Sequence, residues 1–407
     1  MLVWAGTAVA AGAIATALPF FVMASPSAAQ PGPDSVRLYT LQPVGLRGSM
    51  SVTGFGVGKV LHTADGGQVF GFDVDQNGPD GLLASAQTIS PQGQVLASVE
   101  TFDQSTVTIT KTILTSRTMD DFVTYGIFAG DVGLVQHDHV IGTRDHRSWH
   151  LMNPVTGQTF TGRWTPPDAT NFLLNQIVDS QTTPTTVAMG TDFMGRPRVF
   201  STNVAANTFG PVIHLNGNTF GDGDAPQLAF DSVNDDAVIA TSPDGGRVGG
   251  HVPVIAIVDL ATGKARQFDG VSIPPFFSGF VNGFAVDSAT GIGCTTTELD
   301  ASVEFYTLAT GSGFSVVLPG SNGNQFETGE AVVNDPIHKL FLVVQPNGSV
   351  GPTGDSVIDV FTERGRLVKS IAGFKAFSVT PGIAINPGKR TGFISGPSQD
   401  ALTAFSY

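Results

Sequence analysis

The chain has 407 residues, only 13% of them charged, and a formal net charge of −14. Its basic residues form no cluster that could attract a phosphate backbone, so we expect no nucleic-acid partner. The 50 glycines, 25 prolines and 41% apolar content favour many short strands joined by turns and argue against helical folds.

The N-terminus begins with an apolar stretch, residues 2–24, followed by the small residues Ser27 and Ala29. This pattern predicts a signal peptide over 1–29 and a short linker over 30–34. The product would be secreted, extracellular or periplasmic, with no membrane attachment after cleavage. The alternative is a retained anchor, because the stretch is long enough to span a bilayer. Cys294 is the only cysteine, which excludes an intramolecular disulfide and fits an exported bacterial protein.

Apolar runs that end in Asp or Asn recur along the rest of the chain, at Asp73, Asn175, Asp231, Asp287, Asn334 and Asn386. From Asn175 onward the intervals are 56, 56, 47 and 52 residues, and the first interval has room for two units. A repeat of roughly 50 residues in a Gly-rich, strand-like sequence is typical of a β-propeller. The Asp or Asn of each unit is expected at the turn between its first two strands, A and B.

A second series of turn residues keeps the same period, at Gly157, Asn207, Gly263, Gly311 and Gly365. Glycine and asparagine tolerate a positive φ, so this series predicts the turn between the third and fourth strands, C and D. A degenerate turn near Ser105 belongs to the first unit.

The two series predict an all-β fold, a seven-bladed β-propeller with four-stranded antiparallel blades. The residues from Gly382 to Tyr407 suffice for three strands of the last blade. We therefore expect an N-terminal strand, 35–41, to complete that blade and to close the ring. Residues 35–407 would form a single domain, and we expect a monomer.

Two of the turns resemble a known family. Val-Asp-Leu-Ala-Thr-Gly-Lys at 258–264 and Ala-Val-Asp-x-x-x-Gly at 285–291 are similar to turns of the secreted bacterial propellers called YVTN or lactonase-like. The resemblance covers most of 120–407 and implies fold and export. The sequence has no catalytic motif that is diagnostic of any one family.

Four of the eight histidines lie within fourteen residues, including His137, His139 and His146, in a segment that we interpret as a B–C loop over 138–146. Histidines at i and i+2 on an extended backbone share one side, as the ligands of a divalent metal ion would. His251 lies in a later loop that could reach the same place. The alternative is a solvated loop without a metal.

A second candidate cation site is Asp73-x-Asp75-x-Asn77-Gly78, which matches the start of a calcium-binding loop. The twelfth position should be Glu and is Ala84. An ordinary Asx-rich turn explains the same residues.

Residues before or at the start of each first strand are expected at the mouth of the central channel. Gluconolactonase-type propellers hold one divalent cation in a similar ring of Asp, Asn and Glu, and the cation polarises a lactone or ester carbonyl. That likeness implies His137 or His139 as a base and the following metal ligands: Asp121, Asn171, Asp224, Asn282 and Glu330. The alternative is a hydrated polar channel.

The B–C and D–A loops are expected to surround the channel mouth, and loops on a rigid scaffold commonly carry function. Candidate ligand-binding residues on these loops are His146, His251, Glu298, Phe276 and Phe277. The sequence favours an exported propeller that binds a small ligand, a glycan or a protein partner on this face. The alternative is a divalent-metal-dependent hydrolase of lactones or esters, so the sequence leaves enzymatic activity open. If a cofactor binds, we expect a divalent cation, with calcium ahead of zinc.

Overall fold

The computed structural model describes most of the chain from residue 56 onward, as segments separated by connections. The described residues are 40–41, 56–64, 66–75, 78–88, 95–116, 121–129, 132–141, 144–152, 173–179, 185–191, 197–203, 206–215, 226–242, 253–270, 281–297, 302–319, 331–346, 356–374, 382–395 and 400–407. Every regular element within these segments is a β-strand. No helix in these segments is long and apolar enough to cross a membrane.

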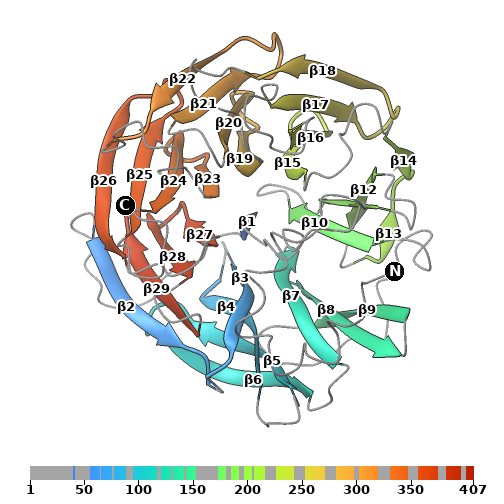
Figure 1. Ribbon diagram of the computed structural model, residues 1–407, viewed down its shortest axis with the longest axis vertical. Helices are drawn as coiled ribbons and strands as arrows, with labels where there is room; N and C mark the ends of the chain where they lie inside the picture. Colours follow the sequence, from blue (N-terminus) through green and yellow to red (C-terminus); the bar gives the residue numbers. More distant parts are fainter. Residues whose placement is uncertain are drawn as a thin grey trace, which may run out of the picture.

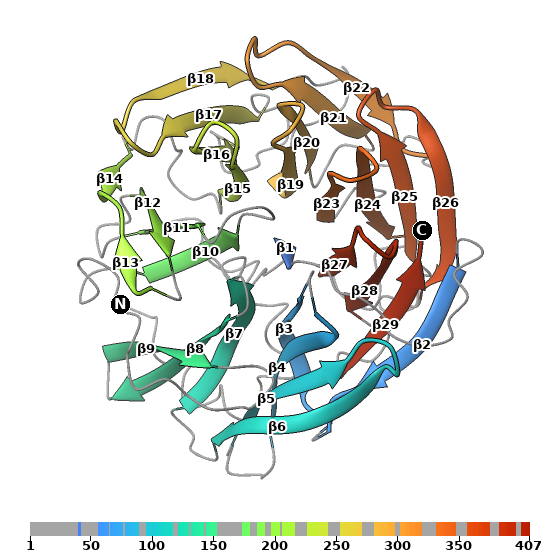
Figure 2. The same ribbon diagram turned by 180° about the vertical axis from the view of Figure 1, so that it is seen from behind.

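The strands form sheets arranged around a central axis (Figures 1 and 2). Within a sheet the first strand lies nearest the axis and the next strands follow outward. The first sheet comprises β3 (Gln68–Val74), β4 (Asp80–Thr88), β5 (Val95–Asp103) and β6 (Thr108–Ser116). The second sheet comprises β7 (Asp121–Ala129), β8 (Val132–Ile141) and β9 (Arg144–Met152). The third is β10 (Leu173–Asp179), β11 (Thr186–Thr191), β12 (Pro197–Asn203), β13 (Thr208–Phe209) and β14 (Ile213–His214).

Three regular four-stranded sheets follow. The fourth is β15 (Gln227–Asp231), β16 (Asp236–Thr241), β17 (Val254–Asp259) and β18 (Ala265–Asp269). The fifth is β19 (Val281–Asp287), β20 (Ile292–Thr297), β21 (Ser302–Thr307) and β22 (Gly313–Val317). The sixth is β23 (Ala331–Asp335), β24 (Leu340–Pro346), β25 (Ser356–Thr362) and β26 (Leu367–Phe374).

The last sheet joins both ends of the described chain. It contains β27 (Ile383–Asn386), β28 (Thr391–Ser395) and β29 (Ala401–Ser406), followed outward by β2 (Gly56–His62). An N-terminal strand does complete this blade, but it is β2 and not the expected segment 35–41. Of that segment the structure describes β1 (Thr40–Leu41), which pairs in parallel with the innermost strand β27. The free edge available to an outer strand is that of β29, and β2 occupies it in antiparallel register.

The prediction of seven four-stranded blades is wrong. Six sheets have four antiparallel strands or more in the described residues, and β7–β9 is a three-stranded sheet between the first and second of these blades. The sequence-based count placed a C–D turn at Gly157, and 153–172 lie outside the described residues. The fold is an all-β, six-bladed propeller of four-stranded antiparallel blades, with the three-stranded sheet β7–β9 in the same ring.

Local turn chemistry explains the hairpins. The C–D turns have positive φ at Asn207 (51°), Gly263 (70°), Gly311 (71°) and Gly365 (69°), which confirms those positions of the turn series. At the A–B corners, the carboxylate of Asp231 accepts the backbone N–H groups of Val233 and Asn234. Such bonds hold a turn while the chain reverses direction.

The predicted A–B series fits three of its six positions. Asp73 lies one residue before the last paired residue of β3, and Asn175 lies inside β10, which continues to Asp179. Asp231, Asp287 and Asn386 each occupy the last paired position of a first strand, as expected. In the sixth sheet that position belongs to Asp335 and not to Asn334. The Asp335 carboxylate accepts the N–H groups of the turn, because the first strand extends one residue further than the sequence pattern indicates.

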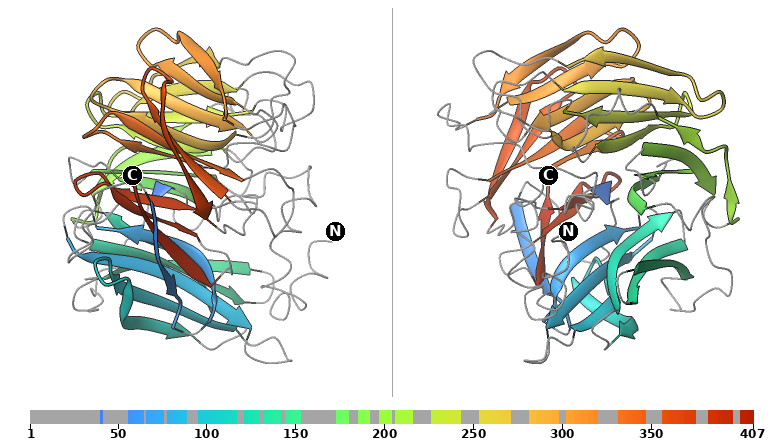
Figure 3. Two further views of the ribbon diagram at one scale, coloured as in Figure 1. Left: turned by 90° about the vertical axis from the view of Figure 1, so that its left-hand side faces the viewer. Right: turned by 45° about the vertical axis from the view of Figure 1, so that its right-hand side comes forward.

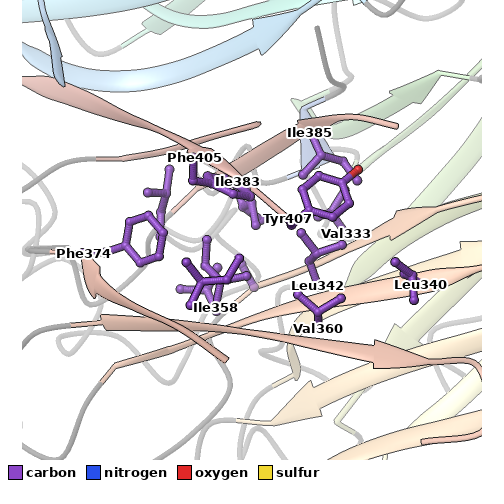
Figure 4. Packing of buried hydrophobic residues seen from close by; sticks show 14 residues of the cluster. Val333, Leu340, Leu342, Ile358, Val360, Phe374, Ile383, Ile385, Phe405 and Tyr407 are labelled. Carbon is purple, nitrogen blue, oxygen red and sulfur yellow. The ribbon is translucent and has the colours of Figure 1, made fainter. Parts of the chain in front are cut away.

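The hydrophobic core lies between neighbouring sheets. Figure 4 shows one such layer, in which Val333, Leu342 and Val360 of the sixth sheet meet Ile383 and Phe405 of the last sheet. Burying one such side chain stabilises the fold by about 1.5–3 kcal/mol. Figure 3 shows the ring from two further sides. Its inner strands contact those of the next sheet at β15 and β19, at β19 and β23, and at β23 and β27, so these blades support one another.

Candidate functional site

Strand direction divides the connections between two rims. The turn rim consists of the A–B and C–D turns, which include residues 232–235, 288–291, 336–339, 387–390, 260–264, 308–312 and 363–366. The loop rim consists of the B–C and D–A connections, which include 215–226, 242–253, 270–280, 318–330 and 347–355. The turn-rim segments named above have four or five residues. The five long loop-rim connections have nine to thirteen, although other connections on that rim are short, such as 298–301 and 192–196.

The polar side chains of the turn rim form hydrogen bonds with the backbone of their own turns. Asp287 accepts N–H groups from Ala289 and Thr290, and Asp259 accepts them from Ala261 and Thr262. These carboxylates already stabilise turns, so they are poor candidates for binding a ligand.

The inner strands carry amide side chains towards the axis of the ring. Gln176 of β10 donates to the side-chain oxygen of Gln227 of β15 at 2.9 Å, and its own oxygen accepts the N–H of Leu228 at 2.5 Å. Asn282 in the next inner strand is only 1% exposed. Figure 1 places β1 inside the ring, where it contacts β27 and β3. Amide side chains therefore join the neighbouring inner strands β10 and β15, and the N-terminal strand β1 lies inside the ring against β27 and β3.

The structure tests little of the predicted metal ring. Asn282 lies at the start of β19, and Asp121 is the first residue of β7. The other sequence-based candidates lie outside the described residues: Asn171, Asp224 and Glu330 for the ring, and His251, Glu298, Phe276 and Phe277 for ligand binding. Among the described side chains, which do not include those of β7–β9, no group of three His, Cys, Asp or Glu could hold a metal ion. The ring stays a prediction.

The histidine segment is placed differently from the prediction. His137 and His139 lie in β8 and His146 lies in β9, so they are on paired strands and not in a loop over 138–146. The register pairs His139 with His146, and it pairs Asp121 with His139. The backbone thus brings three of the candidate residues into one row.

The predicted calcium motif lies in the β3–β4 hairpin. Asp73 is paired with Leu82 inside the sheet and is 1% exposed, and Asp75 closes the hairpin by donating its backbone N–H to the carbonyl of Asp80 at 3.0 Å. A Cβ added at Gly78 would lie 1.8 Å from the Asp75 carboxylate, so a close contact explains this glycine without a metal. Asn77 lies outside the described residues. Calcium binding stays a prediction.

Buried carboxyl groups in third strands escaped the sequence analysis. Glu100, Glu304 and Asp359 are each at most 2% exposed. Glu100 accepts the backbone N–H of Ala64 at 3.2 Å, and Glu304 accepts a hydrogen bond from the Tyr306 hydroxyl. A single acidic residue within an apolar strand, as in 302–307 or 356–362, is the sequence pattern that could have identified them.

Burial changes the protonation of several of these groups. Burial raises the pKa of Asp359 to about 6, although a hydrogen bond from Ser370 opposes the shift. The pKa of Asp287 also rises to about 6, first through burial and then through the neighbouring Glu363. Burial, aided by Glu304, raises the pKa of the Cys294 thiol well above its ordinary value. Because the reactive form of cysteine is the thiolate, Cys294 is unsuited to be a nucleophile.

No protein-family model and no curated protein sequence matches this chain. Solved structures do match it. A chain in a crystal structure of the mitotic checkpoint complex has a TM-score of 0.56 and 12% identity, over 90% of this chain and 96% of that chain. The RRP9 WD40 repeats reach 0.55 and 13% identity, over 86% and 96%. The β-propeller domain of Cps50 (Swd1) from Myceliophteria thermophila reaches 0.52 and 12%, over 87% and 100%.

Similarity at 12–13% identity establishes the β-propeller fold and nothing finer. The lactonase-like resemblance stays a prediction, as does any activity that it implies. Function must be argued from the residues of the chain itself.

Proposed function

We propose that this chain is an exported, non-enzymatic binding protein that holds a protein partner on its loop rim. The observation that supports the proposal is the asymmetry between the rims. Long connections emerge from the same end of several rigid blades, whereas the other end is closed by short, hydrogen-bonded turns. Surface loops positioned by a rigid scaffold are a common way to build a binding site.

The composition of the loop rim indicates the chemistry of the partner. Its connections 215–226 and 318–330 contain Asp222, Asp224, Glu327 and Glu330 and no Lys or Arg. The connection 270–280 adds Phe276 and Phe277. A rim whose connections carry both aromatic and acidic residues suits a partner that presents apolar and basic residues together.

Two further observations support the proposal. The matched chain from the mitotic checkpoint complex belongs, by its title, to a protein assembly, although at 12% identity this is an analogy of fold. The apolar leader at 2–24 supports export.

The proposal can be tested with two sets of variants of the mature chain, residues 30–407. In the loop-rim variant, Phe276 and Phe277 are replaced by Ser and Glu327 and Glu330 by Gln. In the matched turn-rim variant, the exposed residues Val233 and Ile337 are replaced by Ser and Lys389 and Lys264 by Gln. The wild type is crosslinked to secreted and cell-surface proteins of the source organism, and captured proteins are quantified with each variant.

We expect a specific protein that binds the wild type and the turn-rim variant but is captured at least tenfold less by the loop-rim variant. Added salt should weaken the capture, because dissolved ions screen the attraction between acidic groups of the loop rim and basic groups of the partner. Loss of capture in the turn-rim variant alone would overturn the proposal. Capture of a glycan or small molecule in place of a protein, or chelator-sensitive hydrolysis of lactones or esters, would contradict it as well.

A further inference from the structure

The three-stranded sheet β7–β9 brings histidines and a carboxylate together by its register. Asp121 in β7 pairs directly with His139 in β8, and His139 pairs directly with His146 in β9. The three residues therefore form one row across three neighbouring strands. The pairing of β7 with β8 is irregular between Val123 and Tyr125. This irregularity follows Asp121 in the strand, so it does not affect the pairing of Asp121 with His139.

Directly paired residues of an antiparallel sheet share one face, and so do residues two apart in one strand. His137, two residues before His139, and His150, four residues after His146, therefore share the face of the row. This face thus collects four of the eight histidines of the chain together with Asp121.

The spacing of these positions suits a metal ion. Cβ atoms of directly paired residues lie about 4.5–5.5 Å apart, and residues two apart in a strand are separated by about 6.6 Å. Imidazole rings at such separations can reach one ion at the usual Zn–N distance of about 2.0–2.1 Å. Imidazole favours zinc, copper and nickel over calcium, and a carboxylate can complete the ligand set or orient a histidine.

We propose that His137, His139 and His146 bind one divalent transition-metal ion, zinc in the first place. Asp121, on the other side of His139 from His146, would orient His139. The site lies at the end of the sheet where β7 begins and the β8–β9 hairpin turns, which places it towards the loop rim. It differs from the predicted metal ring, whose ligands come from different blades, and it does not require the proposed protein partner.

Other histidines of the chain show what a purely structural histidine looks like here. His338 lies 2.8 Å from the carboxylate of Asp335, and His62 lies 3.4 Å from that of Asp400, each with one acidic partner. On the face of the β7–β9 row four histidines are found with one Asp, an excess that simple His–Asp pairing does not explain. On the opposite face, Asp138 is paired in the register with Arg147.

Zinc binding to the full mature chain tests the proposal directly. The protein is stripped with a chelator and titrated with zinc ions in a calorimeter, and cobalt(II) is used in parallel because its visible spectrum reports nitrogen ligands. We expect one ion per chain with micromolar or tighter affinity. The variant His139→Gln/His146→Gln should bind at least 100-fold more weakly, and Asp121→Asn about 10–100-fold more weakly.

The matched control is His62→Gln/His214→Gln, which removes two histidines outside the row and should leave zinc affinity unchanged. Zinc should raise the thermal midpoint of the wild type and of this control but not that of His139→Gln/His146→Gln. If that variant fails to fold, the single variant His137→Gln replaces it. Its cobalt spectrum should differ from that of the wild type, because one nitrogen ligand has been removed. Less than one ion per chain, or equal affinity in the row variant and the control, would overturn the proposal.

Discussion

At the scale of single residues, this propeller buries carboxyl groups where the sequence pattern indicates only apolar strand. Asp359 accepts a hydrogen bond from the Ser370 hydroxyl, and the Gln345 amide can donate to its other oxygen at 3.0 Å. Two neutral donors do not offset the loss of water around a charge. Burial therefore raises the pKa of Asp359 to about 6, and the group holds a proton in mildly acidic solution.

The raised pKa has a defined consequence for stability. Because the folded pKa of about 6 exceeds the ordinary value of 3.8, the folded state binds more protons between these values. The stabilising contribution of this group is complete below pH 3.8 and is lost as the pH rises through 6.

We therefore predict that Asp359→Asn has a pH-dependent effect on the free energy of unfolding. Asparagine mimics the neutral acid, so the variant should gain up to about 2 kcal/mol relative to the wild type between pH 4.5 and pH 7.5. Urea denaturation at the two pH values measures this difference.

The control is Asp259→Asn, which removes a carboxylate whose pKa is lowered by hydrogen bonds from Thr262. This group is ionised at both pH values, so its replacement should have nearly the same effect at each. A pH-independent effect of Asp359→Asn would show that Asp359 is not a buried acid.

At the scale of strands and turns, the fold rests on hairpins whose turns have a positive φ. Gly291 and Gly311 have nearly equal φ values of 67° and 71°, but they differ in their surroundings. A Cβ at Gly291 would meet nothing within 4 Å, whereas a Cβ at Gly311 would lie 2.8 Å from the ring of Phe268 in the preceding blade. One turn is thus constrained by its backbone alone and the other also by contact between blades.

We predict that Gly291→Ala lowers the free energy of unfolding by about 1–2 kcal/mol, the cost of the left-handed conformation for an L-residue. Gly311→Ala should lose about 1–3 kcal/mol more, because Phe268 must move out of a packed interface. Urea denaturation of the two variants gives both values. Equal losses would mean that blades do not meet at this turn.

The turns also show how far the sequence specifies the structure. The positions of Gly263, Gly311, Gly365 and Asn207 could be predicted because a positive φ is a local requirement. The neighbours Asn334 and Asp335 could not be told apart, because either side chain can accept the N–H groups of a turn. Pairing with β24, a non-local interaction, places Asp335 at the corner.

The histidine segment shows the same limit. The blade period predicts a B–C loop over 138–146, yet the chain forms two paired strands there, joined after Ile141. A repeat period places a connection only to within several residues, whereas the register of the pairing defines where the hairpin turns. The sequence could supply the ligand types of the candidate site but not their alignment in a row.

At the scale of the whole molecule, stability depends on closing the ring. Strand β2 pairs with β29, so residues more than 300 positions apart lie side by side, and the pairing protects an otherwise free sheet edge. The closing strand could not be chosen from the sequence, because 35–41 and 56–62 both have a composition typical of a strand. The blade count was wrong for a related reason, since periodicity counts repeats but does not establish which repeats have four strands.

An engineered disulfide between β2 and β29 tests the closure of the ring most directly. A Cβ at Gly58 of β2 would lie 3.3 Å from the Cβ of Ala404 of β29, close to the usual separation of about 3.5–4.5 Å across a disulfide. The native Cys294 is buried and leaves the surface without a competing thiol among the described residues.

Gly58→Cys/Ala404→Cys should therefore form an intramolecular disulfide in the folded monomer under mild oxidation. The bond should raise the thermal midpoint above that of the reduced protein. In the chain-entropy picture it adds up to about 6 kcal/mol to the free energy of unfolding for a loop of this length. Mass spectrometry and thiol counting of the oxidised monomer measure the outcome. One cross-link per chain is the predicted result, and two free engineered thiols or disulfide-linked dimers would contradict the closed ring.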